Sequence, residues 1–192
     1  LAAIEGLGSL RDSRADEALG ALLLDPLEDK PFREVGVVKA AAAKSLGAIG
    51  DAAAARALIK LLALAPSSYR SDETARSYAA IALGERREAA AAQALLGNID
   101  PSREADLNYH CIVALGRIGW GPGGDLSCLS SLLPIVKKAL PAWKAAPSSR
   151  TLYAAYWALL PLESDSVRQL CLERWNARGE AKGGFALGAW FA

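Results

Sequence analysis

The fold of this chain is decided by residues 38–51, which read Val38-Lys39-Ala40-Ala41-Ala42-Ala43-Lys44-Ser45-Leu46-Gly47-Ala48-Ile49-Gly50-Asp51. Alanine and leucine lose little conformational freedom on entering a helix, so the alanine-rich part predicts one. Glycine tolerates the positive φ at which many helices end, and we expect Gly47 to end this one. Asp51 can accept backbone N–H bonds at the start of a following helix. Residues 54–62 then continue with apolar side chains, so the stretch predicts a helical hairpin.

The same pattern returns along the chain. Its leucine recurs at Leu7, Leu46, Leu83, Leu115 and, in a degenerate copy, Leu159, at steps of 39, 37, 32 and 44 residues. A glycine follows each of the first four leucines, and we expect it to end the first helix of its copy. The copies cover roughly residues 1–26, 32–65, 72–97, 104–140 and 150–177, with the start of a further copy at 183–192. One hairpin cannot bury its apolar face alone, so the copies must stack.

These observations predict an all-α protein, a right-handed α-solenoid (superhelix) of about five hairpins that forms one domain over residues 1–192. Hydrophobic residues make up 52% of the 192 residues, which excludes a disordered chain. A net charge of +1 argues against a general binder of polyanions, which needs many cations. The chain opens at Leu1 and closes in residues 183–192 within apolar helical patterns, so we expect an array truncated at both ends.

The repeat unit resembles a known family. An alanine-rich helix that ends in Leu-Gly-x-Ile-Gly-Asp, followed by an Ala/Leu helix, is similar to HEAT repeats, especially the short HEAT-like subtype first noted in phycobilisome lyases. The resemblance covers nearly the whole chain and is weakest at residues 150–177. It is specific for the fold and not for the function. The ankyrin signature Thr-Pro-Leu-His is missing, the Trp and Tyr positions of tetratricopeptide repeats do not recur, and the steps are short for armadillo repeats.

Residues that could carry chemistry are few. His110 is the only histidine, and its neighbour Cys111 points about 100° away on a helix, so the two do not form a nucleophile–base pair. The glycine-rich segment 119–125 lacks the Gly-Lys-Ser/Thr ending of a phosphate-binding loop. A single histidine does not fit HEAT-like di-iron hydroxylases either, unless missing parts supply ligands. We therefore predict no catalytic residue, no metal and no cofactor.

Three cysteines, at positions 111, 128 and 171, are too widely spaced for a CxxC metal site or a disulfide framework. We interpret them as small buried hydrophobic residues, with a Cys111–Cys128 disulfide as the alternative for an exported protein. The sequence thus leaves the compartment open between the cytoplasm and export. No apolar run approaches the roughly 20 residues of a membrane span.

The resemblance implies a concave surface lined by the second helices, the surface that this family uses for binding. Its candidate residues are the polar positions of those helices and two tryptophans. They are Arg56, Lys60, Arg87, Gln93, Trp120, Lys137, Lys138, Arg168, Gln169, Glu173 and Trp175. Trp120 stands among glycines, where it either meets a partner or folds back onto the solenoid. The polar residues either bind a partner or only solvate their helices.

The sequence favours a non-catalytic scaffold, a fragment of a larger HEAT-repeat protein, that binds a protein partner on its concave face. The resemblance leaves two alternatives. One is a chromophore attachment or chaperone protein similar to the phycobilin lyases. The other is a DNA-binding protein similar to HEAT-like alkylpurine glycosylases, which need an acidic residue beside aromatic ones; Asp125 and Asp165 are the candidates. A surplus of only three basic groups over residues 86–150 favours a protein partner over nucleic acid.

Overall fold

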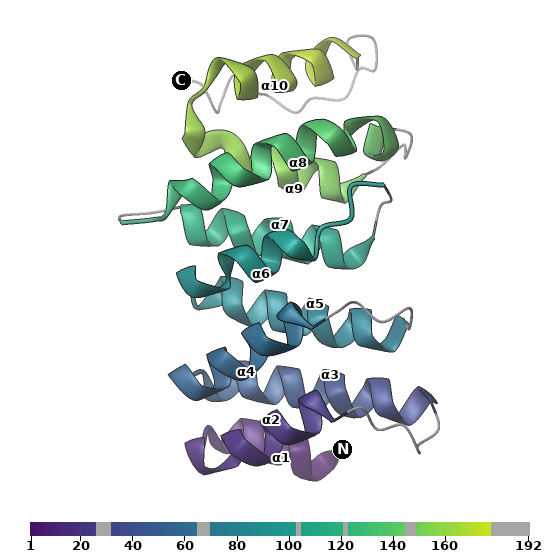
Figure 1. Cartoon of the computed structure of the whole chain (residues 1–192), viewed down its shortest axis with the longest axis vertical. Helices are drawn as coiled ribbons and strands as arrows, with labels where there is room; N and C mark the ends of the chain where they lie inside the picture. Colours follow the sequence, from purple (N-terminus) through teal and green to yellow (C-terminus); the bar gives the residue numbers. More distant parts are fainter. Residues whose placement is uncertain (26–31, 65–69, 103–104, 121–122, 145–148, 178–192) are drawn as a thin grey trace. The chain divides into compact units, whose positions relative to one another are not determined.

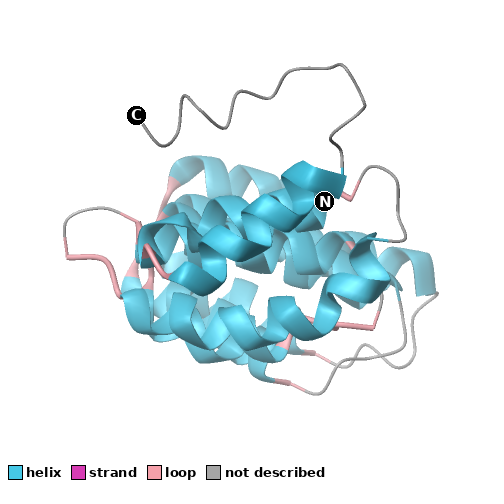
Figure 2. Ribbon diagram, turned by 90° about the horizontal axis from the view of Figure 1, so that it is seen from above, coloured by secondary structure: helices cyan, strands magenta, loops and turns pink. Residues whose placement is uncertain are grey.

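The computed structural model describes residues 1–25, 32–64, 70–102, 105–120, 123–144 and 149–177. In these ranges the regular structure is entirely helical, which confirms the all-α prediction (Figure 2). The α-helices are α1 (Ala2–Leu10), α2 (Asp16–Leu24), α3 (Phe32–Ile49), α4 (Ala52–Ala63), α5 (Arg70–Glu85), α6 (Ala92–Gly97), α7 (Asp106–Gly119), α8 (Leu126–Lys144), α9 (Arg150–Leu159) and α10 (Asp165–Ala177). Three 3-10 turns, η1 (Ser13–Ala15), η2 (Ala89–Ala91) and η3 (Leu160–Leu162), complete them.

The chain divides into two compact units, Leu1–Leu162 and Glu163–Ala192. The first holds α1 to α9, and α10 belongs to the second. The expected copy at 183–192 lies outside the described residues. The single domain over 1–192 and the right-handed twist stay predictions.

Helices of the first unit are arranged in two layers (Figure 1). Helices α1, α3, α5, α7 and α9 pack side by side in chain order, and we call them the first-helix layer. Helices α2, α4, α6 and α8 pack in the same order and form the second-helix layer. Each second helix also contacts the first helix of the next copy, for example α4 on α5. Stacked hairpins of this kind are the predicted α-solenoid.

The glycine of the Leu-Gly pair has a different role from the expected one. Gly47, Gly84 and Gly116 lie in the last turn of α3, α5 and α7, one to three residues before the final residue, and none of them has the positive φ of a helix-ending glycine. Each lies where its helix touches the next first helix. An added Cβ would come within 2.6 Å of Ala82 Cβ at Gly47 and within 2.7 Å of Ala114 Cα at Gly84. The glycines therefore allow close helix packing. The left-handed turn falls instead on Gly50, with φ 72°.

The core lies between the two layers. Its largest fully buried side chains include Trp143, Leu46, Leu83 and Leu115. Three of these are leucines of the repeat pattern, which explains why they recur at one position in each copy. Asp51 accepts a hydrogen bond from the backbone N–H of Ala54 at 2.8 Å and begins α4, as expected.

A buried arginine joins three helices, a feature that the repeat pattern does not indicate. Arg76 of α5 is only 2% exposed. Its Nη1 donates to the carbonyl oxygen of Leu62 at 3.2 Å and to Oδ1 of Asn98 at 3.0 Å, and its Nη2 donates to the carbonyl oxygen of Leu64 at 3.1 Å. Asn98 in turn donates to the Leu62 carbonyl at 2.7 Å. The network thus satisfies the carbonyls at the C-terminal end of α4, where a cation is also favoured by the helix dipole.

Two carboxyl groups meet where the first two copies touch. Asp16, at the start of α2, is 8% exposed and shares a hydrogen bond with Asp51. Burial and the neighbouring Asp51 carboxylate raise the pKa of Asp16 to about 6. The hydrogen bond from the Ala54 N–H lowers the pKa of Asp51, so the proton belongs to Asp16.

This pair gives a pH-dependent stability that one substitution should remove. The unfolded pKa of Asp is about 3.9, so the folded chain alone holds the Asp16 proton between about pH 4 and 6. The stability due to this proton is complete below pH 4 and is lost as the pH rises through 6. We expect Asp16→Asn to raise the free energy of unfolding by about 1 kcal/mol at pH 7 and to leave it unchanged at pH 4. Urea unfolding followed by circular dichroism at both pH values measures the difference, and an equal effect at pH 4 and 7 would contradict it.

Candidate functional site

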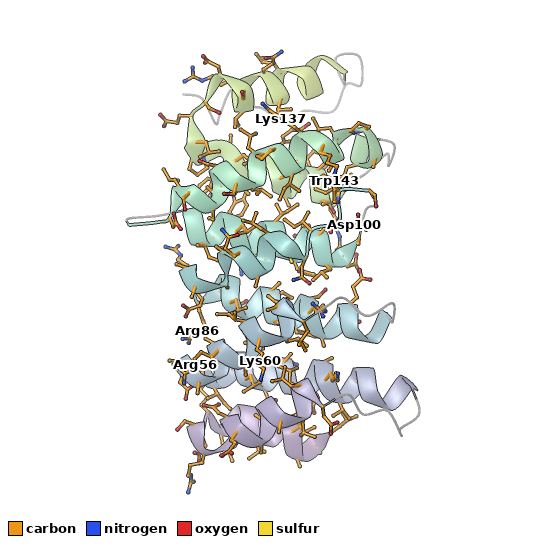
Figure 3. The ribbon with its side chains drawn as sticks, in the orientation of Figure 1. Arg56, Lys60, Arg86, Asp100, Lys137 and Trp143 are labelled. Atoms are coloured by element: carbon orange, nitrogen blue, oxygen red, sulfur yellow. The ribbon has the colours of Figure 1, made fainter. Side chains whose placement is uncertain are left out.

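The second-helix layer presents exposed cations. Arg56 and Lys60 of α4, and Lys137 and Lys138 of α8, are all exposed. Figure 3 labels the first three of them. None of the four forms an ion pair within the described part of the chain. The sequences of α4, α6 and α8 contain no Asp or Glu at all. Helix α2, the remaining helix of this layer, carries Asp16 and Glu17. The uncompensated positive charge therefore belongs to the part of the layer formed by α4, α6 and α8.

Among the other described side chains expected on the second helices, Arg87 is the one that lies elsewhere. Gln93 is exposed on α6, as expected for a second helix. Arg87, however, lies in the turn after α5, in the left-handed conformation with φ 52°. Arg168 and Gln169 are exposed on α10, which belongs to the second unit, and Arg168 donates a hydrogen bond to Asp165 at 3.3 Å. The side chains of Glu173 and Trp175 lie outside the described residues.

Trp120 follows the end of α7 and folds back onto the repeats. Its ring stacks on that of Trp157 in α9, with centroids 5.1 Å apart and an interplanar angle of 13°. The side chain is half-buried, and its indole nitrogen is buried without a hydrogen-bond partner. Of the two arrangements considered for Trp120, the structure shows the one that packs on the solenoid.

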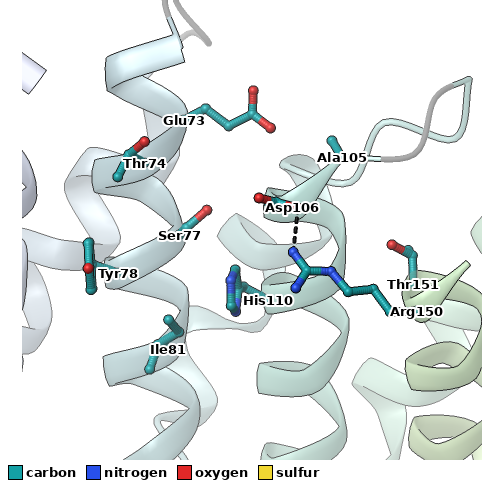
Figure 4. Close-up of a pocket in the computed structure, with 10 residues that line it drawn as sticks. All are labelled: Glu73, Thr74, Ser77, Tyr78, Ile81, Ala105, Asp106, His110, Arg150 and Thr151. Atoms are coloured by element: carbon teal, nitrogen blue, oxygen red, sulfur yellow. Dashed lines mark hydrogen bonds and ion pairs between the residues drawn. The ribbon is translucent and has the colours of Figure 1, made fainter.

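A hollow of about 610 Å³ opens on the first-helix layer (Figure 4). It lies between α5 and the N-terminal ends of α7 and α9. Its lining is mostly polar and consists of Glu73, Thr74, Ser77, Tyr78, Ile81, Ala105, Asp106, His110, Arg150 and Thr151. Helix α7 begins here without a side-chain cap.

The charges of this hollow are largely neutralised. Arg150 forms an ion pair with Asp106, and its guanidinium carbon lies 4.7 Å from the centre of the Tyr109 ring. Burial, followed by the charge of Arg150, lowers the pKa of His110, so this histidine is neutral at pH 7. No hydrogen bond joins His110 to Ser77, the hydroxyl that shares the hollow, and both side chains lie in the described part of the chain. The arrangement is that of a polar cleft and not of a nucleophile–base pair.

A second hollow, of about 500 Å³, lies on the same layer near the C-terminal ends of α1, α3 and α5. Three cations line it, Arg11, Lys44 and Arg86, against one acid, Glu85. Glycine and alanine residues of α3 and α5 form much of the rest. Tyr78 and Ile81 line both hollows, so these two side chains stand between them.

Comparison with known families agrees with this architecture. The family model of the PBS lyase HEAT-like repeat matches residues 1–25 and 38–63. The chain carries HEAT-like repeats. The first match covers α1 and α2, and the second covers α4 with most of α3. No curated protein matches the chain significantly.

Of the residues expected to bind a partner, none whose side chain the structure describes lines either hollow of the HEAT-like array. The expectation followed the family's use of second helices, whereas both hollows lie between first helices. Tyr78 is the sequence feature that could have indicated the hollows, because it is a large aromatic residue among Ala and Ser on a first helix. In the structure its side chain is 38% exposed.

Two further features bear on chemistry. Cys111 and Cys128 are buried free thiols, and burial raises the pKa of both, which makes them unreactive. The side chain of Cys171 lies outside the described residues. Over the ranges that the structure describes, no group of three or more His, Cys, Asp or Glu is placed to hold a metal ion. None of the helices described is long and apolar enough to cross a membrane.

Proposed function

We propose that this HEAT-like array is a non-catalytic scaffold that binds an acidic surface of a partner protein with the α4, α6 and α8 part of its second-helix layer. The observation that carries the proposal is the charge of that part. Arg56, Lys60, Lys137 and Lys138 are exposed, and α4, α6 and α8 offer no acid to neutralise them. A surface with uncompensated charge of one sign speeds the encounter with a surface of the opposite sign and selects against like-charged partners.

The spacing of these cations favours a protein over a nucleic acid. Helix α6 lies between α4 and α8 in this layer and carries no charged residue. Neighbouring helices are about 8–10 Å apart, so the two cation pairs are separated by roughly 20 Å. Binding to nucleic acid draws its affinity from many closely spaced phosphate contacts, which this arrangement and a net charge of +1 do not provide.

A charge reversal on this layer tests the proposal. We expect Lys60→Glu to lower the capture of the partner from an extract of the source cells by about tenfold, because it places a like charge opposite an acidic surface. The charge-conserving Lys60→Arg should retain the partner. Lys39→Glu on α3, in the first-helix layer, is the matched control with the same charge change. Quantitative mass spectrometry of the captured proteins gives the ratios. Equal profiles for Lys60→Glu and Lys39→Glu would contradict the proposal.

A second candidate is a chromophore attachment or chaperone role, because the matched repeat model is that of the PBS lyase HEAT-like repeat. Incubation of the protein with a bilin and an apo-phycobiliprotein separates the two candidates. A shift in the bilin absorption spectrum would favour the lyase-like role, and its absence would favour the scaffold.

A further inference from the structure

The two hollows of the first-helix layer form one recognition surface. They lie on either side of Tyr78 and Ile81, the smaller between α3 and α5 and the larger between α5 and α7. Adjacent helices are about 8–10 Å apart, and the α5 residues that line only one of the hollows are centred about nine residues, or roughly 14 Å, apart along its axis. The hollows are therefore separated by roughly 16 Å, or about five residues of an extended chain at roughly 3.3 Å each. A peptide that crosses α5 in an extended conformation can therefore place one side chain in each.

The smaller hollow has the charge to select the first of these side chains. Arg11 and Lys44 are exposed and form no ion pair with any described residue. The charge of Arg86, the third cation, acts on Asp51, whose pKa it helps to lower. Glu85, the acidic residue of this hollow, forms an ion pair with Arg117 at 3.8 Å. Two uncompensated cations thus remain at one end of the surface.

The rest of the surface suits a peptide backbone and a larger side chain. Gly47, Ala48 and Gly50 line the smaller hollow and have no side chain long enough to fill it. Tyr78 is 38% exposed at the boundary, where its ring offers apolar contact to a passing chain. The larger hollow, at about 610 Å³, has room for an aromatic side chain, and its hydroxyl groups can bind a polar tip (Figure 4).

We propose that this surface binds an extended acidic peptide of a partner protein, with a carboxylate between Arg11 and Lys44 and a bulky side chain, about five residues away, in the larger hollow beside Tyr78. The site is separate from the second-helix layer and goes beyond the scaffold role proposed above. Its occupant is identified by charge complementarity and by the spacing of the two hollows.

Fluorescence anisotropy with a synthetic probe tests the inference. The probe is a fluorescein-labelled peptide with two adjacent glutamates and a tyrosine about five residues after the first of them. Its control has glutamines at the two acidic positions. We expect the full chain to bind the glutamate peptide about tenfold more tightly, and Arg11→Glu/Lys44→Glu to abolish this preference. Lys39→Glu/Arg168→Glu, the same charge reversal at two residues that line neither hollow, should change the affinity by less than about twofold. Arg11, Lys44 and Arg168 are exposed and Lys39 is half-buried, and circular dichroism confirms that each variant is folded.

Three results would overturn the proposal. The first is equal affinity for the two peptides, or no binding of either. The second is an equal loss with both double variants, which would indicate general electrostatic attraction. The third is tighter binding of an oligothymidylate of equal charge, which would assign the surface to nucleic acid. Because the scaffold proposal depends on Lys60 and this one on Arg11 and Lys44, each can fail without the other.

Discussion

Replacement of Arg76 by leucine is expected to lower the free energy of unfolding by about 3 kcal/mol, one of the two largest effects that we predict. Leucine fills much of the space but donates no hydrogen bond. Oδ1 of Asn98, a residue only 9% exposed, would lose its bond to the guanidinium. The carbonyl oxygen of Leu64, a residue that is 44% exposed, would lose its bond as well. A buried acceptor without a partner costs its full desolvation. The C-terminal end of α4 would also lose the cation that its dipole favours.

Urea unfolding monitored by circular dichroism at 222 nm measures this loss. Arg117→Leu is the matched control, because it is the same substitution at a surface position of α7, where the arginine side chain is 42% exposed. We expect Arg117→Leu to lower the free energy of unfolding by less than about 0.5 kcal/mol. Arg76→Lys should recover part of the stability, since it keeps the charge but loses the planar fork that reaches two helices. Equal losses for Arg76→Leu and Arg117→Leu would show that the network does not hold α4, α5 and α6 together.

The second large effect is expected at Gly84. A methyl group there would lie 2.7 Å from the Cα and 2.8 Å from the Cβ of Ala114, so α5 and α7 must move apart. Backbone cannot yield as a flexible side chain does, and Gly84→Ala should therefore cost about 2–3 kcal/mol, with a larger loss for Gly84→Val. Separation of two first helices also loosens the apolar contacts of both neighbouring copies.

Gly6→Ala provides the control for this prediction. Gly6 is also helical, in α1, but no atom lies within 4 Å of an added Cβ. Alanine is the better helix former by about 1 kcal/mol, so this exchange should leave the stability unchanged or raise it. If close packing is the reason for Gly84, thermal and urea unfolding should show a loss of stability for Gly84→Ala and no loss, or a gain, for Gly6→Ala. A loss of stability of similar size at both positions would mean that the glycine after the repeat leucine is not there to allow close helix packing.

The repeat pattern allowed most of the fold to be predicted from the sequence alone. The alanine-rich helices, their hairpins and their stacking follow from residues 38–51 and their copies, because helix propensity and apolar spacing are local properties. The role of Asp51 as the N-cap of the second helix in its hairpin was predicted for the same reason. The role of Gly47 was not, since a glycine near a helix end and a glycine at a helix contact look alike in a single sequence.

The candidate site was predicted less well. Arg56, Lys60 and Lys137 were identified as polar residues of second helices, and they are exposed there. The hollows around Tyr78 were missed. Whether a gap is left between two helices depends on the tilt and separation of α3, α5 and α7, and these are set by contacts such as that of Gly84 with Ala114.

The sequence by itself therefore determined that the protein is an array of paired helices. Four of the five repeat leucines, Leu46, Leu83, Leu115 and Leu159, lie in its core, whereas Leu7 is exposed. Only the tertiary structure decided that Arg76 is buried, that Trp120 stacks on Trp157 and that Arg11 shares a hollow with Tyr78. The physical reason is the range of the interactions. Helix formation is decided among residues three or four positions apart, whereas burial, stacking and charge at these sites join residues from different copies, which meet only after the layers have packed.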